Sequence, residues 1–143
     1  MAHEHQADMK FRHLGIAVAK LDGTLQSYAQ LFGYKLISGP FDDPIQKVSV
    51  CFLGTGDPAD AVVELIAPLT EDSPVKGVLA RGGGAYHMCF ETPRLDEALT
   101  EVLAKGCLLV SQPVPAVAFG GRRIAWIYTP TRQLIELLEQ EVR

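Results

Sequence analysis

The stretch RHLGIAVAKLDGTL, residues 12–25, has a counterpart in YHMCFETPRLDEAL, residues 86–99. Both contain a histidine, an apolar segment, a basic residue, a Leu-Asp pair and then a helical pattern. His13 and His87 are separated by 87 − 13 = 74 positions, and the two Leu-Asp pairs have the same separation. Self-similarity at a fixed period is the sequence signature of a repeated structural unit. The two stretches therefore predict that the chain consists of two copies of one module.

Two further matches follow in the same order. LFGYKLISGP (31–40) and LAKGCLLVSQP (103–113) both end a helical pattern near glycine and enter an apolar run that stops at proline. AVVELIAP (61–68) is echoed by QLIELLEQ (133–140), which places Glu64 and Glu136 at 136 − 64 = 72 positions apart. A drift of two residues is what a change of loop length in a duplicated unit produces. Four matches in one order favour duplication over chance.

Each module is predicted to have the order βαβββ, which places the fold in the α+β class. Alternating apolar residues indicate strands, and apolar residues three or four apart indicate helices. For the first module we expect a strand at 11–19, a helix at 21–32 and strands at about 34–38, 47–53 and 61–67. For the second module we expect a strand at 85–91, a helix at 95–105 and strands near 107–111, 123–128 and 133–139.

The length of 143 residues corresponds to one domain with a core of its own. We expect a disordered tail at 1–8 and a single domain at 9–143. Within it, module one occupies about 9–69, a linker with a short helix at 74–80 occupies about 70–84, and module two occupies about 85–140.

Composition excludes several classes of protein. A hydrophobic content of 48% and a charged content of 21% are ordinary for a globular protein. The net charge of −4 does not suit nucleic acid, which needs a positive surface. No apolar run approaches the roughly 18–20 residues of a membrane span, and no secretory signal is visible. Three cysteines without CxxC spacing indicate a reducing compartment. We therefore expect a cytoplasmic protein that acts on a small molecule, without a nucleic-acid or membrane partner.

Four strands each carry one polar side chain on the face turned away from the helices. Because side chains alternate along a strand, Tyr86, Met88 and Phe90 are expected on the helix-covered face and His87 on the other. The same alternation gives the set His13, Glu64, His87 and Glu136. A buried imidazole or carboxylate costs several kcal/mol unless it is paired or coordinated. A pseudo-twofold axis between the modules would bring the four into one cleft.

Two histidines and two glutamates suit a divalent ion such as Zn²⁺, Mn²⁺, Co²⁺, Ni²⁺ or Fe²⁺. For His87 alone, a satisfied core histidine would be the simpler interpretation. The three partners at matching positions of the repeat favour ligation instead. We therefore predict one divalent metal per chain, of undetermined identity, held by these four residues.

The chain resembles the vicinal oxygen chelate superfamily in the motifs HLGIAV (13–18), VVELIAPL (62–69), YHMCFE (86–91) and LIELLEQ (134–140). This superfamily includes glyoxalase I, methylmalonyl-CoA epimerases, extradiol dioxygenases and bleomycin or fosfomycin resistance proteins, and the epimerases are the most similar. The resemblance implies an open, cup-shaped, eight-stranded mixed sheet with helices on its outer face. It also implies that the metal ligands fall on His13, Glu64, His87 and Glu136. Homodimers are common in the family, so we expect one here.

The chemistry that the resemblance implies is chelation of vicinal or 1,3-related substrate oxygens by the metal. The metal then acts as a Lewis acid and stabilises an enolate. On this basis we expect a metal-dependent isomerase or epimerase of the methylmalonyl-CoA epimerase type. In it, Glu136 is the base that removes the α-proton and Glu64 is a ligand and second acid/base.

Two alternatives remain open at this point. One is a lactoylglutathione lyase of the glyoxalase type, and the other is a non-catalytic protein that sequesters a small toxic molecule. For substrate binding, Arg122 and Arg123 follow a Gly-Gly pair and could meet an anionic group, or they could be solvated loop residues. Trp126 could stack on the substrate or fill the sheet.

Overall fold

Two βαβββ units follow one another in the computed structural model, which describes residues 8–141. The first unit comprises β1 (Lys10–Ala17), α1 (Leu21–Phe32), β2 (Lys35–Asp43), β3 (Val48–Gly54) and β4 (Val62–Pro68). The second comprises β5 (Gly84–Thr92), α3 (Leu95–Ala104), β6 (Leu108–Pro115), β7 (Arg123–Tyr128) and β8 (Leu134–Glu139). The helix α2 (Val75–Ala80) lies between the units, and a 3₁₀ turn η1 (Val117–Phe119) precedes β7. The predicted order of elements is confirmed, whereas the predicted tail at 1–8 lies almost wholly outside the described residues.

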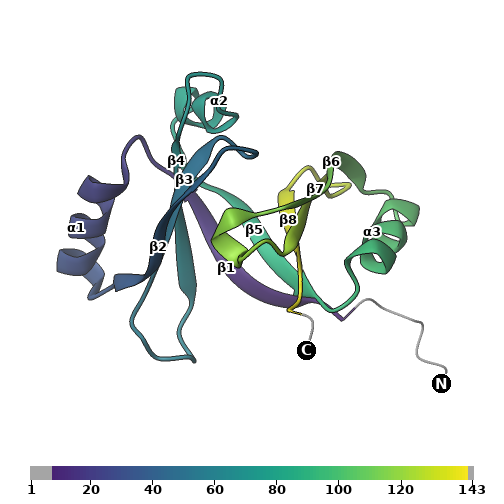
Figure 1. Ribbon diagram of the computed structural model, residues 1–143, viewed down its shortest axis with the longest axis horizontal. Helices are drawn as coiled ribbons and strands as arrows, with labels where there is room; N and C mark the ends of the chain where they lie inside the picture. Colours follow the sequence, from purple (N-terminus) through teal and green to yellow (C-terminus); the bar gives the residue numbers. More distant parts are fainter. Residues whose placement is uncertain (1–7, 142–143) are drawn as a thin grey trace.

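All eight strands form one mixed sheet in the order β2-β3-β4-β1-β5-β8-β7-β6. Within each unit the first strand pairs in parallel with the last, β1 with β4 and β5 with β8. The two units meet where β1 and β5 pair antiparallel. Figure 1 shows these two strands side by side in the middle of the molecule, with α1 and α3 at opposite outer ends. The predicted α+β fold with a curled, eight-stranded sheet is confirmed.

Each long helix covers one face of its own unit. Ile16 and Val18 pack with Leu21 and Leu25 of α1 over the buried Leu65. Equivalent contacts join Met88 and Phe90 to Leu95 and Leu99 of α3. The period-two pattern of β1 and β5 thus directs one set of side chains to the helices and leaves the other face for the concave side.

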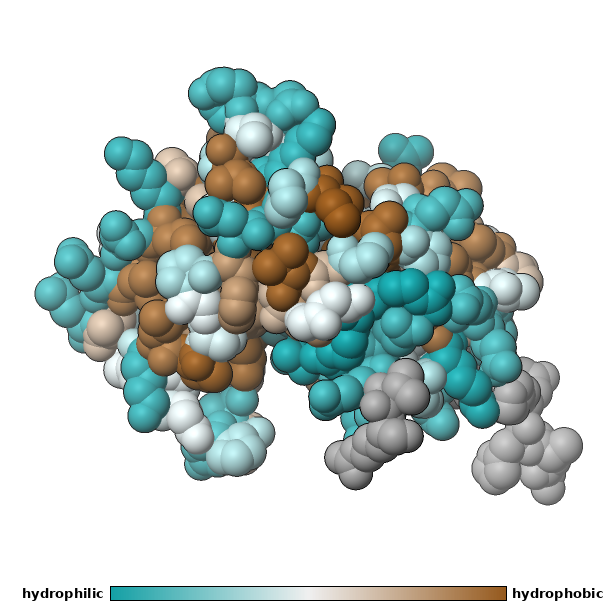
Figure 2. Space-filling model, in the orientation of Figure 1, coloured by the Kyte–Doolittle hydropathy of each residue, from teal (hydrophilic) through white to brown (hydrophobic). Residues whose placement is uncertain are grey.

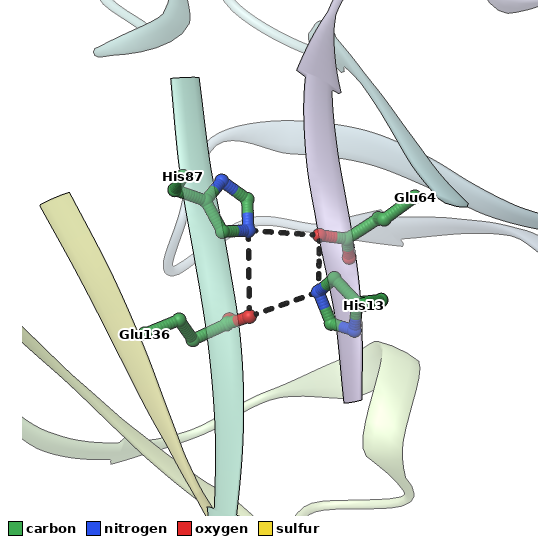
Figure 3. A group of neighbouring side chains, drawn as sticks. All are labelled: His13, Glu64, His87 and Glu136. Carbon is green, nitrogen blue, oxygen red and sulfur yellow. Dashed lines mark ion pairs between the residues drawn. The ribbon is translucent and has the colours of Figure 1, made fainter. Parts of the chain in front are cut away.

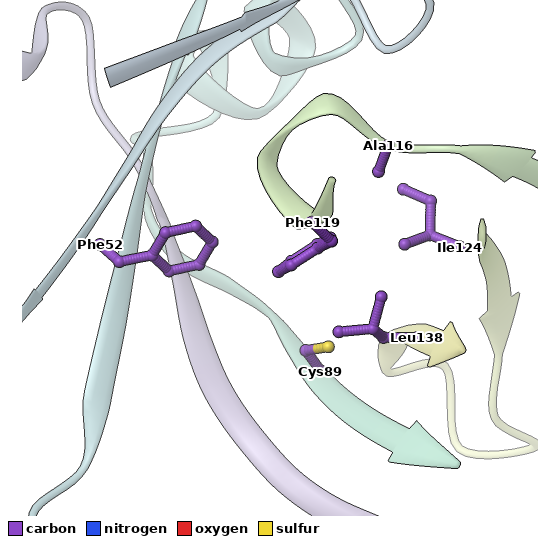
Figure 4. Close-up of a cluster of buried hydrophobic side chains, with 6 residues drawn as sticks. All are labelled: Phe52, Cys89, Ala116, Phe119, Ile124 and Leu138. Atoms are coloured by element: carbon purple, nitrogen blue, oxygen red, sulfur yellow. The ribbon is translucent and has the colours of Figure 1, made fainter. Parts of the chain in front are cut away.

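The concave face has an apolar cluster that joins the two units. It consists of Phe52, Cys89, Ala116, Phe119, Ile124 and Leu138, which Figure 4 shows converging from β3, β5, the segment around η1, β7 and β8. Since Phe52 belongs to the first unit and the other five to the second, burial of this cluster holds the halves together.

Two strands are longer than predicted. We expected β2 and β6 to stop at the prolines, yet β2 continues to Asp43 through Pro40 and β6 continues to Pro115 through Pro113. Both are the edge strands of the sheet. Proline is tolerated on an edge, because the missing N–H group there has no strand to bond with.

The predicted alternation is wrong at Tyr86. The pairing of β1 with β5 shifts register twice, which leaves Arg12 and Tyr86 without a partner opposite them. Each lies directly before the histidine of its unit, so the two units share this β-bulge. A bulge re-aims the side chain of the extra residue. Tyr86 therefore packs on the concave side, against the buried cluster that includes Ala17 and Ile66, instead of joining Met88 and Phe90 under α3.

No helix in residues 8–141 combines the length and the apolar character that a membrane span requires.

Candidate metal centre

Four side chains from four neighbouring strands meet on the concave face. The Nε2 atom of His13 lies 3.1 Å from Oε1 of Glu64 and 3.2 Å from Oε1 of Glu136. The Nε2 atom of His87 lies 3.4 Å and 3.6 Å from the same two oxygens. Figure 3 shows the result as a ring in which histidines and glutamates alternate. The structure thus brings together the four residues that the sequence selects.

The register of the central strands explains this convergence. Gly15 of β1 is paired with both Glu64 of β4 and His87 of β5. Cys89 of β5 occupies the equivalent position of the second unit and is paired with both His13 and Glu136. Each unit therefore supplies one histidine and one glutamate, related by the pseudo-twofold axis between β1 and β5.

Gly15 makes room for the His87 ring. A Cβ atom at this position would lie 2.0 Å from Cε1 and 2.3 Å from Nδ1 of His87, far inside van der Waals contact. The His87 imidazole thus lies directly over the β1 backbone at Gly15, where there is no side chain. Any side chain at position 15 would displace it.

The four side chains are almost completely removed from solvent. His13 is 0% exposed, and the other three are 3 to 4% exposed. Burial alone would lower the pKa of both histidines, but the nearby Glu136 and Glu64 carboxylates outweigh it and raise the pKa above its usual value. Burial would likewise raise the pKa of Glu136, yet His13 and His87 hold it well below its usual range. His13, His87 and Glu136 therefore stabilise one another's charged forms.

This cluster fits a metal ion by two observations. Nε2 of both histidines and Oε1 of Glu136 are buried without a hydrogen-bond partner within the described residues, although buried polar atoms are normally satisfied. One donor atom from each of the four residues lies within 4.8 Å of the others. Bonds of about 2.1 Å at angles of about 90–109° would place neighbouring donors about 3.0–3.4 Å apart. Three of the observed nitrogen–oxygen separations, 3.1, 3.2 and 3.4 Å, fall within that range, and the fourth is slightly longer at 3.6 Å.

Aromatic rings surround the two histidines. The His13 ring contacts Phe52 edge-on at 5.4 Å between centroids and stacks on Phe119 at 6.0 Å. The His87 ring contacts Tyr86 at 4.6 Å and Trp126 at 4.8 Å, both edge-on. These rings keep water from the centre on two sides, which strengthens electrostatic interactions inside it.

A cavity of about 1040 Å³ opens onto the centre, and its lining includes Glu64, His87, Glu136 and Trp126. Hydrophobic side chains gather near the middle of the molecular face in Figure 2, between α2 above and β6–β8 at the right. The cavity is large enough for a drug-sized ligand, since such pockets commonly measure about 300–1,000 Å³. Trp126 lines this cavity, and contact with a substrate, one of the two alternatives for this residue, stays a prediction.

Arg122 and Arg123 are not among the residues that line this cavity. Arg123 forms ion pairs of 2.9 Å with Asp96 and 2.8 Å with Glu139. Arg122 donates hydrogen bonds to the backbone carbonyls of Phe119 and Glu139. This placement does not support a role for Arg122 or Arg123 in substrate binding.

Asp43 was not a candidate in the sequence analysis, yet it is only 3% exposed and also lines the cavity. Its Oδ1 accepts hydrogen bonds from the backbone N–H groups of Ile45 and Gln46, at 3.0 Å and 3.1 Å. Its Oδ2 accepts one from the Val117 N–H of the second unit, at 3.1 Å. Gln46 of the same turn makes a second contact with the second unit, because the Trp126 indole N–H donates to its side-chain oxygen at 3.2 Å. The β2–β3 turn is therefore tied across the cup to the wall that contacts His87.

The comparison with known proteins agrees with this geometry. Residues 12–126 match the sequence model of the Glyoxalase/Bleomycin resistance protein/Dioxygenase superfamily. The chain is 26% identical over 121 residues to the ethylmalonyl-CoA/methylmalonyl-CoA epimerase of Cereibacter sphaeroides, covering 83% of this chain and 87% of that protein. It is 32% identical over 132 residues to a lactoylglutathione lyase of Arabidopsis thaliana, covering 92% of this chain but only 44% of the lyase. The crystal structure of methylmalonyl-CoA epimerase from Mycobacterium tuberculosis superimposes with a TM-score of 0.81 at 27% identity, covering 99% of this chain and 94% of that one.

Proposed function

Because the chain belongs to the Glyoxalase/Bleomycin resistance protein/Dioxygenase superfamily, we propose that it is a metal-dependent epimerase acting on the carbon α to a thioester carbonyl. Its similarity to epimerases and to a lactoylglutathione lyase indicates an enzyme. The observation that carries the proposal is the buried His₂Glu₂ cluster with three of its members in the wall of a large cavity.

In this proposal His13, Glu64, His87 and Glu136 hold one divalent ion. Nitrogen and carboxylate donors suit Zn²⁺, Mn²⁺, Co²⁺, Ni²⁺ or Fe²⁺. Such an ion supplies Lewis-acid stabilisation for the negative charge that develops on the substrate oxygens when the α-proton leaves. A site buried to this extent is suited to that task, because electrostatic stabilisation is stronger away from water.

The two carboxylates divide the proton transfers. Glu136 removes the α-proton, and the electron pair of the broken C–H bond moves into the thioester carbonyl to give the enolate. Glu64, protonated from solvent beforehand, gives its proton to the opposite face of the α-carbon, which inverts its configuration, and Glu136 then releases the abstracted proton to solvent. The ring in Figure 3 supports this division, because Glu64 and Glu136 lie on opposite sides of the histidine pair and both line the cavity.

The experiment that tests the proposal has two parts. The metal content of protein purified without chelator should be close to one divalent ion per chain, and it should be lost in His87→Ala. The metal-loaded protein should exchange the α-proton of methylmalonyl-CoA for deuterium in D₂O. A metal-free protein that cannot be reconstituted with Co²⁺ or Mn²⁺ would contradict the metal site. A metal-loaded protein without exchange would contradict the epimerase activity alone.

A lactoylglutathione lyase is the second candidate. The specific observation in its favour is the pair of carboxylates in the donor set, together with 32% identity to the Arabidopsis thaliana lyase. The same enolisation chemistry applied to the hemithioacetal of methylglyoxal and glutathione gives a lactoyl thioester. Formation of that thioester by the metal-loaded protein would select this function. The intact donor set does not favour a purely sequestering protein.

The homodimer and the cytoplasmic location remain predictions. Analytical ultracentrifugation tests the first, and a fluorescent fusion in the source cell tests the second.

A further inference from the structure

An anionic substrate tail needs a cationic partner at the cavity, and the arginines that the sequence suggested are engaged elsewhere. The charged groups that do line the cavity can be sorted by whether they already have a partner. Asp43 is bound by three backbone N–H groups. Glu64 and Glu136 face the two histidines. Each of these three carboxylates therefore already has partners within the protein.

Of the three lysine and arginine side chains that line the cavity, one is paired with a carboxylate and, among the described residues, two are not. Lys47 is paired with Asp72 at 2.5 Å, and the contact lowers the pKa of that carboxyl group to about 2. Arg81 and Arg132 also line the cavity and are exposed, and neither forms an ion pair within residues 8–141. The uncompensated charge on the cavity wall is thus two guanidinium groups, from the end of α2 and from the β7–β8 turn.

The backbone at Arg132 is a second, independent observation. Its φ angle is 70°, in the left-handed region that glycine adopts freely and other residues adopt at a cost of about 1–2 kcal/mol. The turn is fixed by hydrogen bonds around it: the Arg132 N–H donates to the Thr129 carbonyl, and the Gln133 N–H donates to the Thr129 hydroxyl. The turn therefore fixes the backbone position from which the Arg132 side chain extends on the cavity wall.

The size and the rim of the cavity indicate what that use is. A dicarbonyl unit of a few atoms would fill only a small part of about 1040 Å³. The exposed apolar side chains of Ile45, Val110 and Tyr128 also line the cavity. The cavity thus offers a buried reactive end, an apolar passage and two free guanidinium groups.

We propose that Arg81 and Arg132 bind the anionic groups of a long, thiol-linked substrate tail while the reactive carbonyl end lies at the His₂Glu₂ cluster. Guanidinium groups bind phosphate and carboxylate by the same charge-assisted hydrogen bonds. The anion can therefore be the phosphates of coenzyme A or the carboxylates of glutathione. The placement of the carbonyl end rests on the proposed function, whereas the anion site stands on its own.

The protein contains its own probe for this site, because Trp126 is its single tryptophan and lines the cavity. The experiment follows Trp126 fluorescence during titration with coenzyme A, with glutathione and with the uncharged thiol N-acetylcysteamine. We expect saturable binding of coenzyme A or of glutathione, and whichever binds identifies the source of the anion. N-acetylcysteamine should bind at least tenfold more weakly. The binding should also weaken with added salt, because exposed charges are screened.

Three variants make the test specific. Arg81→Gln and Arg132→Gly should each weaken binding of the anionic thiol about tenfold or more, and Arg132→Lys should retain part of it. Arg132→Gly also relieves the backbone strain, so its melting temperature should equal or exceed that of the parent, which excludes misfolding as the cause. Arg94→Gln removes an exposed arginine outside the cavity, at the start of α3, and should leave binding unchanged.

The proposal is overturned if neither anionic thiol binds, if N-acetylcysteamine binds as tightly, or if Arg94→Gln weakens binding as much as the cavity variants. Because this readout needs neither bound metal nor turnover, its failure is distinguishable from failure of the epimerase proposal, which is measured by α-proton exchange.

Discussion

Substitution of Gly15 by alanine tests the geometry of the centre with a single methyl group. The added Cβ atom would lie 2.0 Å from Cε1 of His87, whereas carbon atoms in contact are separated by about 3.5 Å. The His87 ring must therefore move by about 1.5 Å, three times the tolerance of about 0.5 Å within which a site keeps its geometry. We expect metal affinity to fall about 10–100-fold and α-proton exchange about 100-fold, since a misplacement of about 1 Å can cost that much in rate.

The assay combines competitive Co²⁺ binding, deuterium exchange into methylmalonyl-CoA and thermal unfolding. Gly23→Ala is the matched control, because Gly23 lies in α1 with nothing within 4 Å of an added Cβ atom. That variant should keep full metal affinity and gain about 0.5–1 kcal/mol of stability, as expected when alanine replaces glycine in a helix. If Gly15→Ala binds Co²⁺ as tightly as the parent protein, His87 is not a ligand in the position described.

Glu136→Gln should lower deuterium exchange by at least 100-fold, because an amide cannot accept the α-proton; an exchange rate like that of the parent would remove Glu136 as the base. Asp43→Ala should lower the free energy of unfolding by about 3 kcal/mol, because three backbone N–H groups lose their acceptor. A urea titration measures this, and a loss below about 1 kcal/mol would show that water replaces the carboxylate. Arg123→Gln should destabilise the protein near pH 7 and have less effect in acid. Arg123 holds the pKa values of Glu139 and Asp96 below their usual range, so this stabilisation is present above the ordinary carboxyl pKa of about 4 and is lost as the pH falls through the lowered values. Melting temperatures of both proteins from pH 2 to 7 measure it, and a difference that does not shrink in acid would contradict this explanation.

The order of the elements and the four members of the cluster could be predicted because both depend on local periodicity. A strand period of two assigns His13 and Glu64 to one face without any knowledge of tertiary structure. The repeat then places His87 and Glu136 beside them, because duplicated units pack symmetrically. Strand alternation and the repeat were therefore enough to predict which four residues form the observed ring of donor atoms.

The features that the sequence did not reveal depend on contacts between distant residues. Tyr86 faces the cavity because of a bulge in the pairing of β1 with β5, and a bulge leaves no mark on the alternation of apolar residues. Arg123 looked available because its partners, Asp96 and Glu139, are 27 and 16 positions away. Asp43 was not among the candidate residues, because its burial depends on the approach of Val117 from the second unit.

The division of the donor set between the two units affects how strongly the fold resists unfolding. An ion held by His13 and Glu64 on one side and by His87 and Glu136 on the other is a reversible cross-link between segments more than 70 positions apart. A covalent link that closes a loop of about 70–100 residues stabilises a protein by about 4–5 kcal/mol in the chain-entropy model. The three cysteines of this chain are all free, so no disulfide performs that role. The metal supply of the cell would then govern how long each molecule survives unfolding and proteolysis, in addition to how fast it works.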